Sequence, residues 1–262
     1  MRPSRWFLRL NPQPDPLFRL VMFPNAGAGA GVFRSWSTVF DPRAEVCVMR
    51  PPGRDNRSDE PLCSDLEDLA AGALDELAPL GPAPLALFGH SMGGLVAYVA
   101  AVEWRRRTGA PPVWLGVAAR RAPQFRRRPD ALLELPDFEL AMVLNGRYGG
   151  IPAEVAADAD LLAHYARILR ADIAAMDGYT HRPGDPLDCP VEVFGGRRDP
   201  DATEPELTGW QEVTTRPLRR HMFDGGHFFL HDHREAVAAA TARGVLAALG
   251  VDLTGPAPAR WS

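Results

Sequence analysis

The sequence predicts an α/β fold in which a mostly parallel central sheet is flanked by helices. Two observations lead to this prediction. Short apolar runs alternate along the chain with longer stretches of helical periodicity, which is the pattern of successive βα units. The chain has 262 residues, of which 46% are hydrophobic, so it can bury the core of one large domain of this class.

The expected strands are short apolar runs bounded by turn residues, and the expected helices are longer periodic stretches. Strands are expected at Arg19–Phe23, Glu45–Met49, Leu85–Phe88, Val113–Val117, Val191–Phe194 and Leu218–Phe223. Helices are expected at Leu62–Leu77, Gly93–Arg107 and Arg234–Leu249. In the second helix, Leu95 and Val99 recur at helical spacing, and Gly109 is a typical helix stop. The tail after Gly250 is rich in Pro and Ala and is expected to fray.

One segment breaks the alternation of strands and helices. Residues 119–185 contain no convincing strand, and their pattern is helical, for example over Asp158–Met176. A βα connection needs far fewer residues than this. We therefore predict a single domain with an α/β core over residues 1–118 and 186–262, interrupted by a helical insertion over residues 119–185. Such an insertion can act as a lid over an active site, and ordinary packing helices are the alternative.

Composition and charge exclude several classes of protein. The net charge is −4, and the short basic clusters lack interleaved aromatic residues, so no nucleic-acid partner is expected. All basic residues other than histidine are Arg, which we attribute to genome-wide composition. Cys47, Cys63 and Cys189 lie far apart and outside any CxxC spacing, which argues against a disulfide framework and a zinc site. No metal ligand set is predicted.

The sequence shows no targeting or membrane segment. Neither a signal peptide nor an apolar span of 18 residues can be identified. We therefore expect no membrane association and a cytoplasmic location. A monomeric chain is also expected.

A strong catalytic signal is the segment Gly89-His-Ser-Met-Gly93. It follows an expected strand and begins an expected helix, which is the context of a nucleophile elbow in the α/β-hydrolase fold. The chain must reverse so sharply there that side chains at Gly89 and Gly93 would collide. The turn holds Ser91 in a strained conformation at the positive end of a helix dipole. The sequence therefore predicts a serine hydrolase of the α/β-hydrolase fold, with Ser91 as its nucleophile.

A serine nucleophile needs a histidine base that is oriented by a carboxylate, and in this fold the chain order is Ser, acid, His. His227 lies in the Gly-rich turn Asp224–Leu230, after a strand and before the last helix, and is the predicted base. His90 is expected to be structural. The remaining histidines are assigned to the insertion, to a strand or to the surface; they are His164, His181, His221, His231 and His233.

The predicted acid is Asp199. It follows the strand at Val191–Phe194 and the turn at Gly196, so it reaches the same edge of the sheet as Ser91. Asp201, two residues later, is the alternative, and one of the two can simply initiate the turn or cap the next helix.

The oxyanion hole requires two backbone N–H groups near the reacting carbonyl. Met92, directly after the nucleophile, is expected to supply one of them. The other is expected from Ala26, within the Gly-rich loop formed by residues 24–31 after the first expected strand. A phosphate cradle is the rival interpretation of this loop, but it lacks both the GxGxxG pattern and the Lys of a P-loop.

Eight segments spread along the chain carry a family resemblance. They are Val21-Met-Phe-Pro-Asn-Ala-Gly27, Phe33-Arg-Ser-Trp36, Arg50-Pro-Pro-Gly-Arg54, Gly89-His-Ser-Met-Gly93, Ala119-Arg-Arg-Ala-Pro123, Leu169-Arg-Ala-Asp172, Gly196-Arg-Arg-Asp-Pro200 and Gly225-Gly-His-Phe-Phe229. In this order the segments resemble those of the type II thioesterases, the free-standing editing hydrolases of polyketide and nonribosomal peptide assembly lines. Three positions depart from the family pattern, namely Asn25, Ala28 and Asp177.

The resemblance implies hydrolysis of acyl groups from the phosphopantetheine thiol of an acyl or peptidyl carrier protein. It supports Ser91, Asp199 and His227 as a catalytic triad, with Met92 and Ala26 as oxyanion donors. It also implies that residues 119–185 form a mobile lid. No cofactor is expected, because phosphopantetheine arrives on the carrier protein.

Carrier proteins are usually acidic, so basic clusters are candidates for their docking site. Arg126–Arg128 is one such candidate, with simple solvation of an exposed face as the alternative. Arg105–Arg107 is better explained as cations that stabilise a helix C-terminus.

Two other functions remain open from the sequence. The elbow and triad fit a carboxylesterase or lipase of the same fold equally well. A non-catalytic binding protein on this fold is the third hypothesis, and the complete Ser, Asp, His order argues against it.

Overall fold

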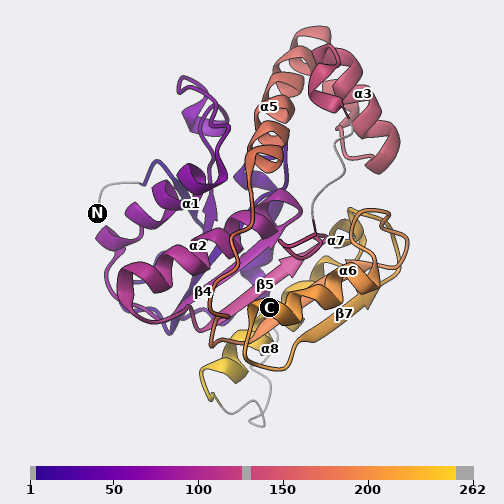
Figure 1. The fold of residues 1–262 in the computed structure, drawn as a ribbon. Coiled ribbons are helices and arrows are strands. Elements are labelled where there is room, and N and C mark those ends of the chain that lie inside the picture. The colour runs from indigo at the N-terminus through magenta and orange to yellow at the C-terminus, as the bar shows by residue number, and fades with distance from the viewer. Residues whose placement is uncertain (1–3, 126–130, 252–262) are drawn as a thin grey trace.

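The computed structural model describes residues 4–125 and 131–251, and in this part of the chain seven strands form a single sheet (Figure 1). The order across the sheet is β1-β3-β2-β4-β5-β6-β7. The strands are β1 (Phe7–Arg9), β2 (Phe18–Phe23), β3 (Ala44–Met49), β4 (Leu85–His90), β5 (Trp114–Ala118), β6 (Val191–Gly196) and β7 (Arg219–Phe223). All neighbouring pairs are parallel except β1 with β3, so the sheet is mostly parallel as predicted.

Helices connect these strands and cover both faces of the sheet. The α-helices are α1 (Leu66–Asp75), α2 (Met92–Thr108), α3 (Asp137–Tyr148), α4 (Ala153–Ala156), α5 (Ala159–Gly178), α6 (Glu204–Thr208), α7 (Phe229–Asp232) and α8 (Arg234–Ala248). The 3-10 helices are η1 (Ala30–Val39), η2 (Asp55–Arg57), η3 (Ala78–Leu80), η4 (Leu132–Glu134) and η5 (Gly209–Val213).

Six of the seven strands and three of the helices lie where the sequence predicts them, within a few residues. The largest shift concerns the helix expected from Leu62, which begins at Leu66 because the Asp65 side chain caps it by accepting hydrogen bonds from two backbone N–H groups. Strand β1 was not predicted. It has only three residues, and it is held by antiparallel pairing with β3 rather than by its own apolar pattern.

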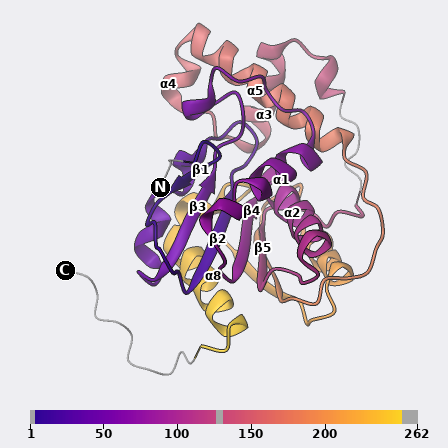
Figure 2. The same cartoon turned by 90° about the vertical axis from the view of Figure 1, so that its left-hand side faces the viewer.

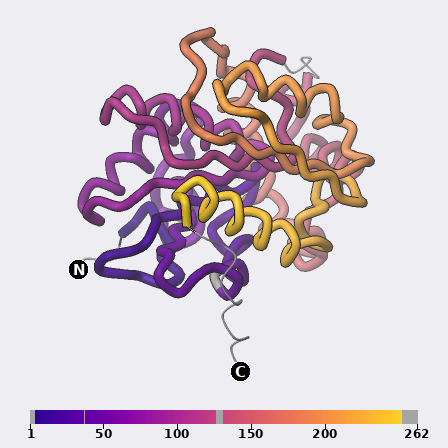
Figure 3. Tube along the Cα trace, turned by 90° about the horizontal axis from the view of Figure 1, so that it is seen from below, coloured from indigo at the N-terminus to yellow at the C-terminus, as the bar shows by residue number. Residues whose placement is uncertain are grey.

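Two apolar layers hold the helices on the sheet. On one face α1 and α2 pack against the strands, and on the other face η1 and α8 do so. Figure 3 shows α8 on one side of the sheet and the segment containing α1 and α2 on the other. Every residue of β4 is buried between the two layers, so this central strand holds the turn that follows it firmly in place.

The helical insertion lies at the carboxyl end of the sheet, where α3, α4 and α5 stand apart from the two covering layers (Figure 2). The helices have a small apolar core of their own, built by α3, α5 and η4. Helix α5 begins after Asp158, whose side chain caps it. Within the described residues of the insertion there is no strand, in agreement with the sequence. The division of the chain into core and lid stays a prediction.

Two expectations fall on residues that the structure does not describe. The fraying expected after Gly250 concerns residues 252–262, and the candidate docking cluster Arg126–Arg128 lies within residues 126–130. Both lie outside the described residues. Among the helices that are described, none combines the length and the apolar character needed to cross a membrane.

We predict that Phe88→Ala destabilises the fold by about 3–5 kcal/mol, because it opens a cavity in the layer beneath the elbow. Phe88 is fully buried on β4, and its ring lies 5.3–5.9 Å from those of Trp36, Phe194 and Phe33. Urea unfolding measures the change. The control is Phe138→Ala on α3, where the ring is 59% exposed and a change within about 0.5 kcal/mol is expected. Equal losses in both variants would contradict the prediction.

Candidate active site

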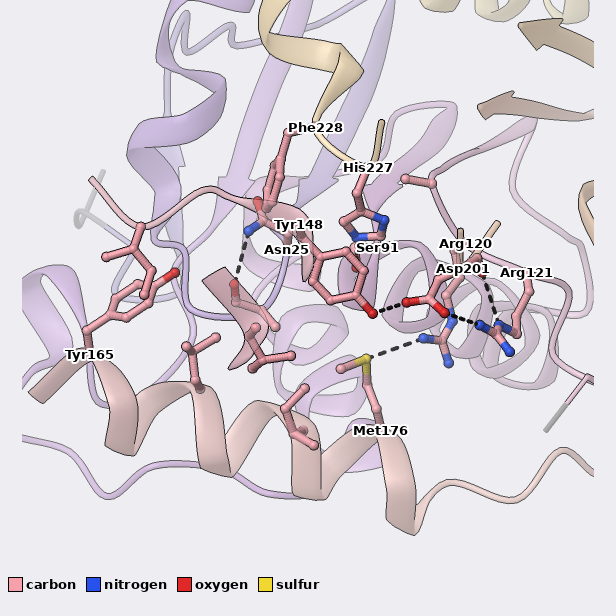
Figure 4. Close-up of a pocket in the computed structure, with 16 residues that line it drawn as sticks. Asn25, Ser91, Arg120, Arg121, Tyr148, Tyr165, Met176, Asp201, His227 and Phe228 are labelled. Carbon is pink, nitrogen blue, oxygen red and sulfur yellow. Dashed lines mark hydrogen bonds and ion pairs between the residues drawn. The ribbon is translucent and has the colours of Figure 1, made fainter. Parts of the chain in front are cut away.

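The candidate site lies at the carboxyl edge of the sheet, where several loops converge. Ser91 follows β4, Asp199 follows β6 and His227 follows β7. The Gly-rich loop, residues 24–31, follows β2 beside them. Because parallel strands all end at the same edge, residues far apart in the sequence meet there (Figure 4).

The turn at Ser91 has the geometry that the sequence predicts. Its φ of 54° and ψ of −116° lie outside the regions that L-residues favour. A Cβ atom on Gly89 would lie 2.0 Å from the carbonyl oxygen of Gly93. A Cβ atom on Gly93 would lie 2.1 Å from the carbonyl oxygen of Phe23. Both glycines are therefore required by close backbone approach, the first within the turn and the second where α2 meets the end of β2.

Ser91, His227 and Asp199 form a continuous hydrogen-bonded chain. Nε2 of His227 lies 2.8 Å from Oγ of Ser91, and Nδ1 lies 2.9 Å from Oδ2 of Asp199. The Asp199 side chain is fully buried and that of His227 is 9% exposed. A buried carboxylate on Nδ1 leaves Nε2 free to accept the Ser91 proton, which is the arrangement that a serine nucleophile needs.

The two candidate acids have different partners. Asp199 contacts His227, whereas Asp201 accepts hydrogen bonds from the hydroxyl of Tyr148 and from Arg121, the latter at 2.9 Å (Figure 4). The backbone N–H of Asp201 also donates to Oδ1 of Asp199 at 3.0 Å. Asp201 therefore connects the loop after β6 to α3 of the insertion. Asp199 is the carboxylate within reach of the histidine.

Tyr148 is a site residue that the sequence did not suggest. It ends α3 of the insertion, and its ring centroid lies 4.8 Å from that of His227. No local pattern marks this tyrosine, because its position depends on how the insertion folds over the sheet. Its contacts with His227 and Asp201 place the insertion directly against the candidate triad.

The predicted oxyanion donors come from the start of α2 and from the Gly-rich loop. Met92 is the first residue of α2, so its N–H has no acceptor within the helix. Ala26 lines the same pocket as Ser91 and His227. The side chain of Asn25 donates to the carbonyl of Ala26 at 3.0 Å, so the residue that departs from the family pattern helps to hold this loop.

The pocket beside Ser91 is mainly apolar. The insertion supplies most of its wall through Leu144, Tyr148, Ile151, Tyr165, Leu169, Ile173 and Met176. Apart from Asn25, Ser91 and His227 and the two tyrosine hydroxyls, the polar groups of the lining are Arg120, Arg121 and Asp201, which follow β5 and β6. Such a pocket suits an apolar acyl group whose carbonyl reaches Ser91.

The other histidines have structural contacts or lie away from Ser91. His90 is buried, and its Nε2 donates to the backbone carbonyl of His227 at 2.9 Å. Burial lowers the pKa of His90 to about 3, so the ring is neutral when it makes this bond. His221 lies in β7 and contacts Glu192 at 2.7 Å, and His233 contacts the carbonyl of Asp224.

The described residues contain no group of three or more His, Cys, Asp or Glu side chains that is arranged to hold a metal ion. Burial raises the pKa of Cys47 and of Cys189 to about 12, and it also raises the pKa of the Cys63 thiol. None of the three cysteines lines the pocket that contains Ser91.

The basic cluster at the end of α2 is occupied by internal contacts. Arg106 and Arg107 both pair with Glu103, and Arg105 donates to the carbonyls of Asp185 and Pro186. These contacts agree with a role at the helix terminus rather than in docking.

Comparison with known proteins identifies the family. The thioesterase domain matches residues 18–243. The chain belongs to the thioesterase family. It is 34% identical to the gramicidin S biosynthesis protein GrsT of Aneurinibacillus migulanus, covering 88% of this chain and 90% of that protein. It is 35% identical to thioesterase PikA5 of Streptomyces venezuelae, covering 87% and 80%.

A solved relative has the same fold. The type II thioesterase BorB from the borrelidin biosynthetic cluster is 30% identical, with a TM-score of 0.83, covering 94% of this chain and 99% of that one. The resemblance to thioesterases and the α/β-hydrolase fold, both predicted from the sequence, are thereby confirmed. The thioesterase family also makes the chain a hydrolase that acts on thioesters.

We predict that His90→Gln flattens the pH dependence of stability. Since the pKa of His90 is about 3 when folded and near 6.5 when unfolded, the unfolded chain binds more protons below pH 6.5. Wild-type stability should therefore fall as the pH drops from 6.5, by up to about 1.4 kcal/mol per pH unit from this group. Gln keeps a donor for the His227 carbonyl without the titration. Urea unfolding from pH 7 to pH 4 tests this, with the exposed His164→Gln as control. Identical slopes in His90→Gln and wild type would refute it.

Proposed function

We propose that this thioesterase removes acyl groups from the phosphopantetheine arm of acyl or peptidyl carrier proteins, as an editing enzyme of a polyketide or nonribosomal peptide assembly line. The observation that carries the proposal is the hydrogen-bonded chain from Ser91 through His227 to Asp199 beside an apolar pocket. The names of the relatives supply the biosynthetic setting, since GrsT belongs to gramicidin S biosynthesis and BorB to the borrelidin cluster.

In the proposed acylation step, Oγ of Ser91 attacks the thioester carbonyl while Nε2 of His227 takes its proton. Asp199 stabilises the imidazolium that forms and holds its tautomer. The C–S bond then breaks, and the proton on His227 passes to the departing sulfur. The products of this step are a Ser91 ester and the free thiol of the carrier arm.

The proposed deacylation step repeats the same geometry with water. His227 takes a proton from a water molecule as it attacks the Ser91 ester, and then returns a proton to Oγ. The carboxylic acid leaves and the serine is restored. Both steps pass through a tetrahedral intermediate whose negative oxygen would be stabilised by the N–H groups of Ala26 and Met92.

The insertion is proposed to act as the lid of this pocket. It supplies Tyr148 next to His227 and the apolar wall that would contact the acyl chain. A carrier-bound substrate has to thread its thioester between this wall and Ser91. Along the wall formed by α3 and α5 the lining favours an uncharged acyl chain, because a charge buried against these apolar side chains would lack a partner.

We predict that Ser91→Ala abolishes thiol release from a panel of acyl-phosphopantetheinyl carrier proteins, because it removes the attacking oxygen. The measurement is the rate of free-thiol formation, with matched oxygen esters run in parallel. Labelling of the wild type, but not of the variant, by a fluorophosphonate checks that the serine is reactive. Faster hydrolysis of the oxygen esters would favour the carboxylesterase alternative, and absence of labelling in folded wild type would favour a binding protein.

The two acids are distinguished by a matched pair of variants. Asp199→Asn should lower kcat by roughly 10⁴, because the histidine loses both its orienting group and its charge partner. Asp201→Asn should lower kcat by less than about tenfold, because its partners are Tyr148 and Arg121 rather than His227. Steady-state kinetics on one thioester gives both values. A larger loss in Asp201→Asn would assign the acid to that residue instead.

A further inference from the structure

Asp172 of helix α5 is completely buried beneath the Gly-rich loop. Its Oδ2 atom accepts a hydrogen bond from the backbone N–H of Gly27 at 2.7 Å. The same carboxylate receives both terminal nitrogens of Arg54, at 2.7 and 2.8 Å. The Arg54 side chain is only 5% exposed. A segment of the insertion, 145 residues further along the chain, thus reaches the residue next to Ala26.

The contacts continue through the loop to the peptide group that carries the Ala26 N–H. Arg54 also donates to the carbonyl of Ala28 at 3.2 Å, and the N–H of Ala28 donates to the carbonyl of Asn25 at 3.1 Å. That carbonyl and the Ala26 N–H belong to one planar peptide unit, so fixing the oxygen also fixes the direction of the N–H. The Arg54–Asp172 pair therefore holds the loop directly at Gly27 and Ala28, and through the Ala28 N–H it reaches the Asn25 carbonyl that precedes Ala26.

The Gly-rich loop and α5 also pack closely against each other at Gly27. Gly27 has a φ of +79°, and a Cβ atom there would lie 2.6 Å from the hydroxyl of Tyr165 and 2.9 Å from Leu169. Both of these side chains belong to α5. The close approach allows the Asp172 carboxylate to accept directly from the Gly27 backbone.

We propose that Asp172 is a positioning residue for the oxyanion hole, acting through the Gly27 N–H and neutralised by Arg54; this inference rests on the proposed function. The pairing with Arg54 is part of the role. Without its partner, a carboxylate bonded to Gly27, the residue next to Ala26, would oppose the negative charge that develops on the substrate oxygen. With Arg54 bound in a bidentate pair, the carboxylate orients the loop without adding net charge.

The decisive variant replaces both charges, Arg54→Met with Asp172→Leu. Buried ion pairs can often be replaced by apolar residues without loss of stability, so this protein is expected to fold. It lacks the acceptor for Gly27 and the donor to Ala28. We expect kcat for acetyl-N-acetylcysteamine thioester to fall roughly 10²–10³-fold, the loss typical of a damaged oxyanion hole, with KM within about threefold of wild type. This small thioester avoids any contribution from carrier docking.

A second readout reports on the oxyanion hole itself. Butylboronic acid forms a bond from boron to Oγ of Ser91, with the serine proton passing to His227, and a boron-bound oxygen then takes the place of the oxyanion. Its inhibition constant should rise in parallel with the fall in kcat. A purely structural role for the pair would lower the melting temperature without weakening boronate binding to the folded enzyme.

Two single variants complete the test. Asp172→Asn keeps an oxygen that can accept from the Gly27 N–H, so kcat should recover to within roughly tenfold of wild type. It also carries the test if the double variant fails to fold. The matched control is Asp137→Asn, which breaks the 2.6 Å ion pair of α3 with Arg170 of α5 and has no contact with the loop. Its kcat and boronate affinity should stay within about twofold.

The inference and the proposed function fail in different ways. If wild type shows no Ser91-dependent hydrolysis of the thioester, the proposed function is wrong. If wild type is active and the folded double variant keeps its kcat or its boronate affinity, the positioning role of Asp172 is wrong. A loss of kcat in Asp137→Asn as large as that in the folded double variant would also overturn it, because it would trace the effect to the insertion as a whole.

Discussion

The turn between β4 and α2 constrains the whole site. Two backbone segments approach each other there so closely that only residues without a Cβ atom fit between them. Gly89 faces the carbonyl of Gly93, and Gly93 in turn faces the carbonyls of Phe23 and Pro24. The start of α2 is thereby pressed against the end of β2. As a result, the first N–H of the helix and the Gly-rich loop lie next to each other, which is the geometry that two oxyanion donors need. The strain at Ser91 is sustained by the buried strand before it and by the hydrogen bond from its N–H to the carbonyl of Ala118.

The residues that sequence reasoning located share one property. Ser91, Asp199 and His227 each follow the carboxyl end of a parallel strand, so a strand pattern followed by a Gly-containing turn is enough to bring them to one edge. Their separation in the sequence does not matter, because the sheet sets their distance. The choice between Asp199 and Asp201 was harder to make from sequence. The two lie in the same loop, and it is their partners in the folded chain that distinguish them: His227 for Asp199, and Tyr148 and Arg121 for Asp201.

The site roles that the sequence does not predict depend on contacts between distant segments. Tyr148 and Asp172 belong to the insertion, and no local pattern states how its helices lie on the sheet. A signal for Asp172 does exist in hindsight. It falls on the same face of α5 as Leu169 and Ile173, both buried, and an acidic residue on a buried helical face requires a partner. The partner, Arg54, could not be read from spacing, because it lies 118 residues earlier.

Two of the buried ion pairs in the described residues have different consequences for the molecule. Arg19 and Glu45 join β2 to β3, and Arg19 also donates to the carbonyls of Leu80 and Gly81, so this pair connects elements that the sheet already fixes. Arg54 and Asp172 join the core to α5 instead. Separating these two would break the two hydrogen bonds between Arg54 and the Asp172 carboxylate and the one from the Gly27 N–H, all of which are charge-assisted. Helix α5 therefore cannot leave the Gly-rich loop without a large free-energy cost. In contrast, α3 contacts the loop after β6 through the side chain of Tyr148, on a carboxylate that is already paired with Arg121. The two main helices of the insertion are thus held to the site with different strengths, and the stronger attachment lies on the side of the proposed oxyanion hole.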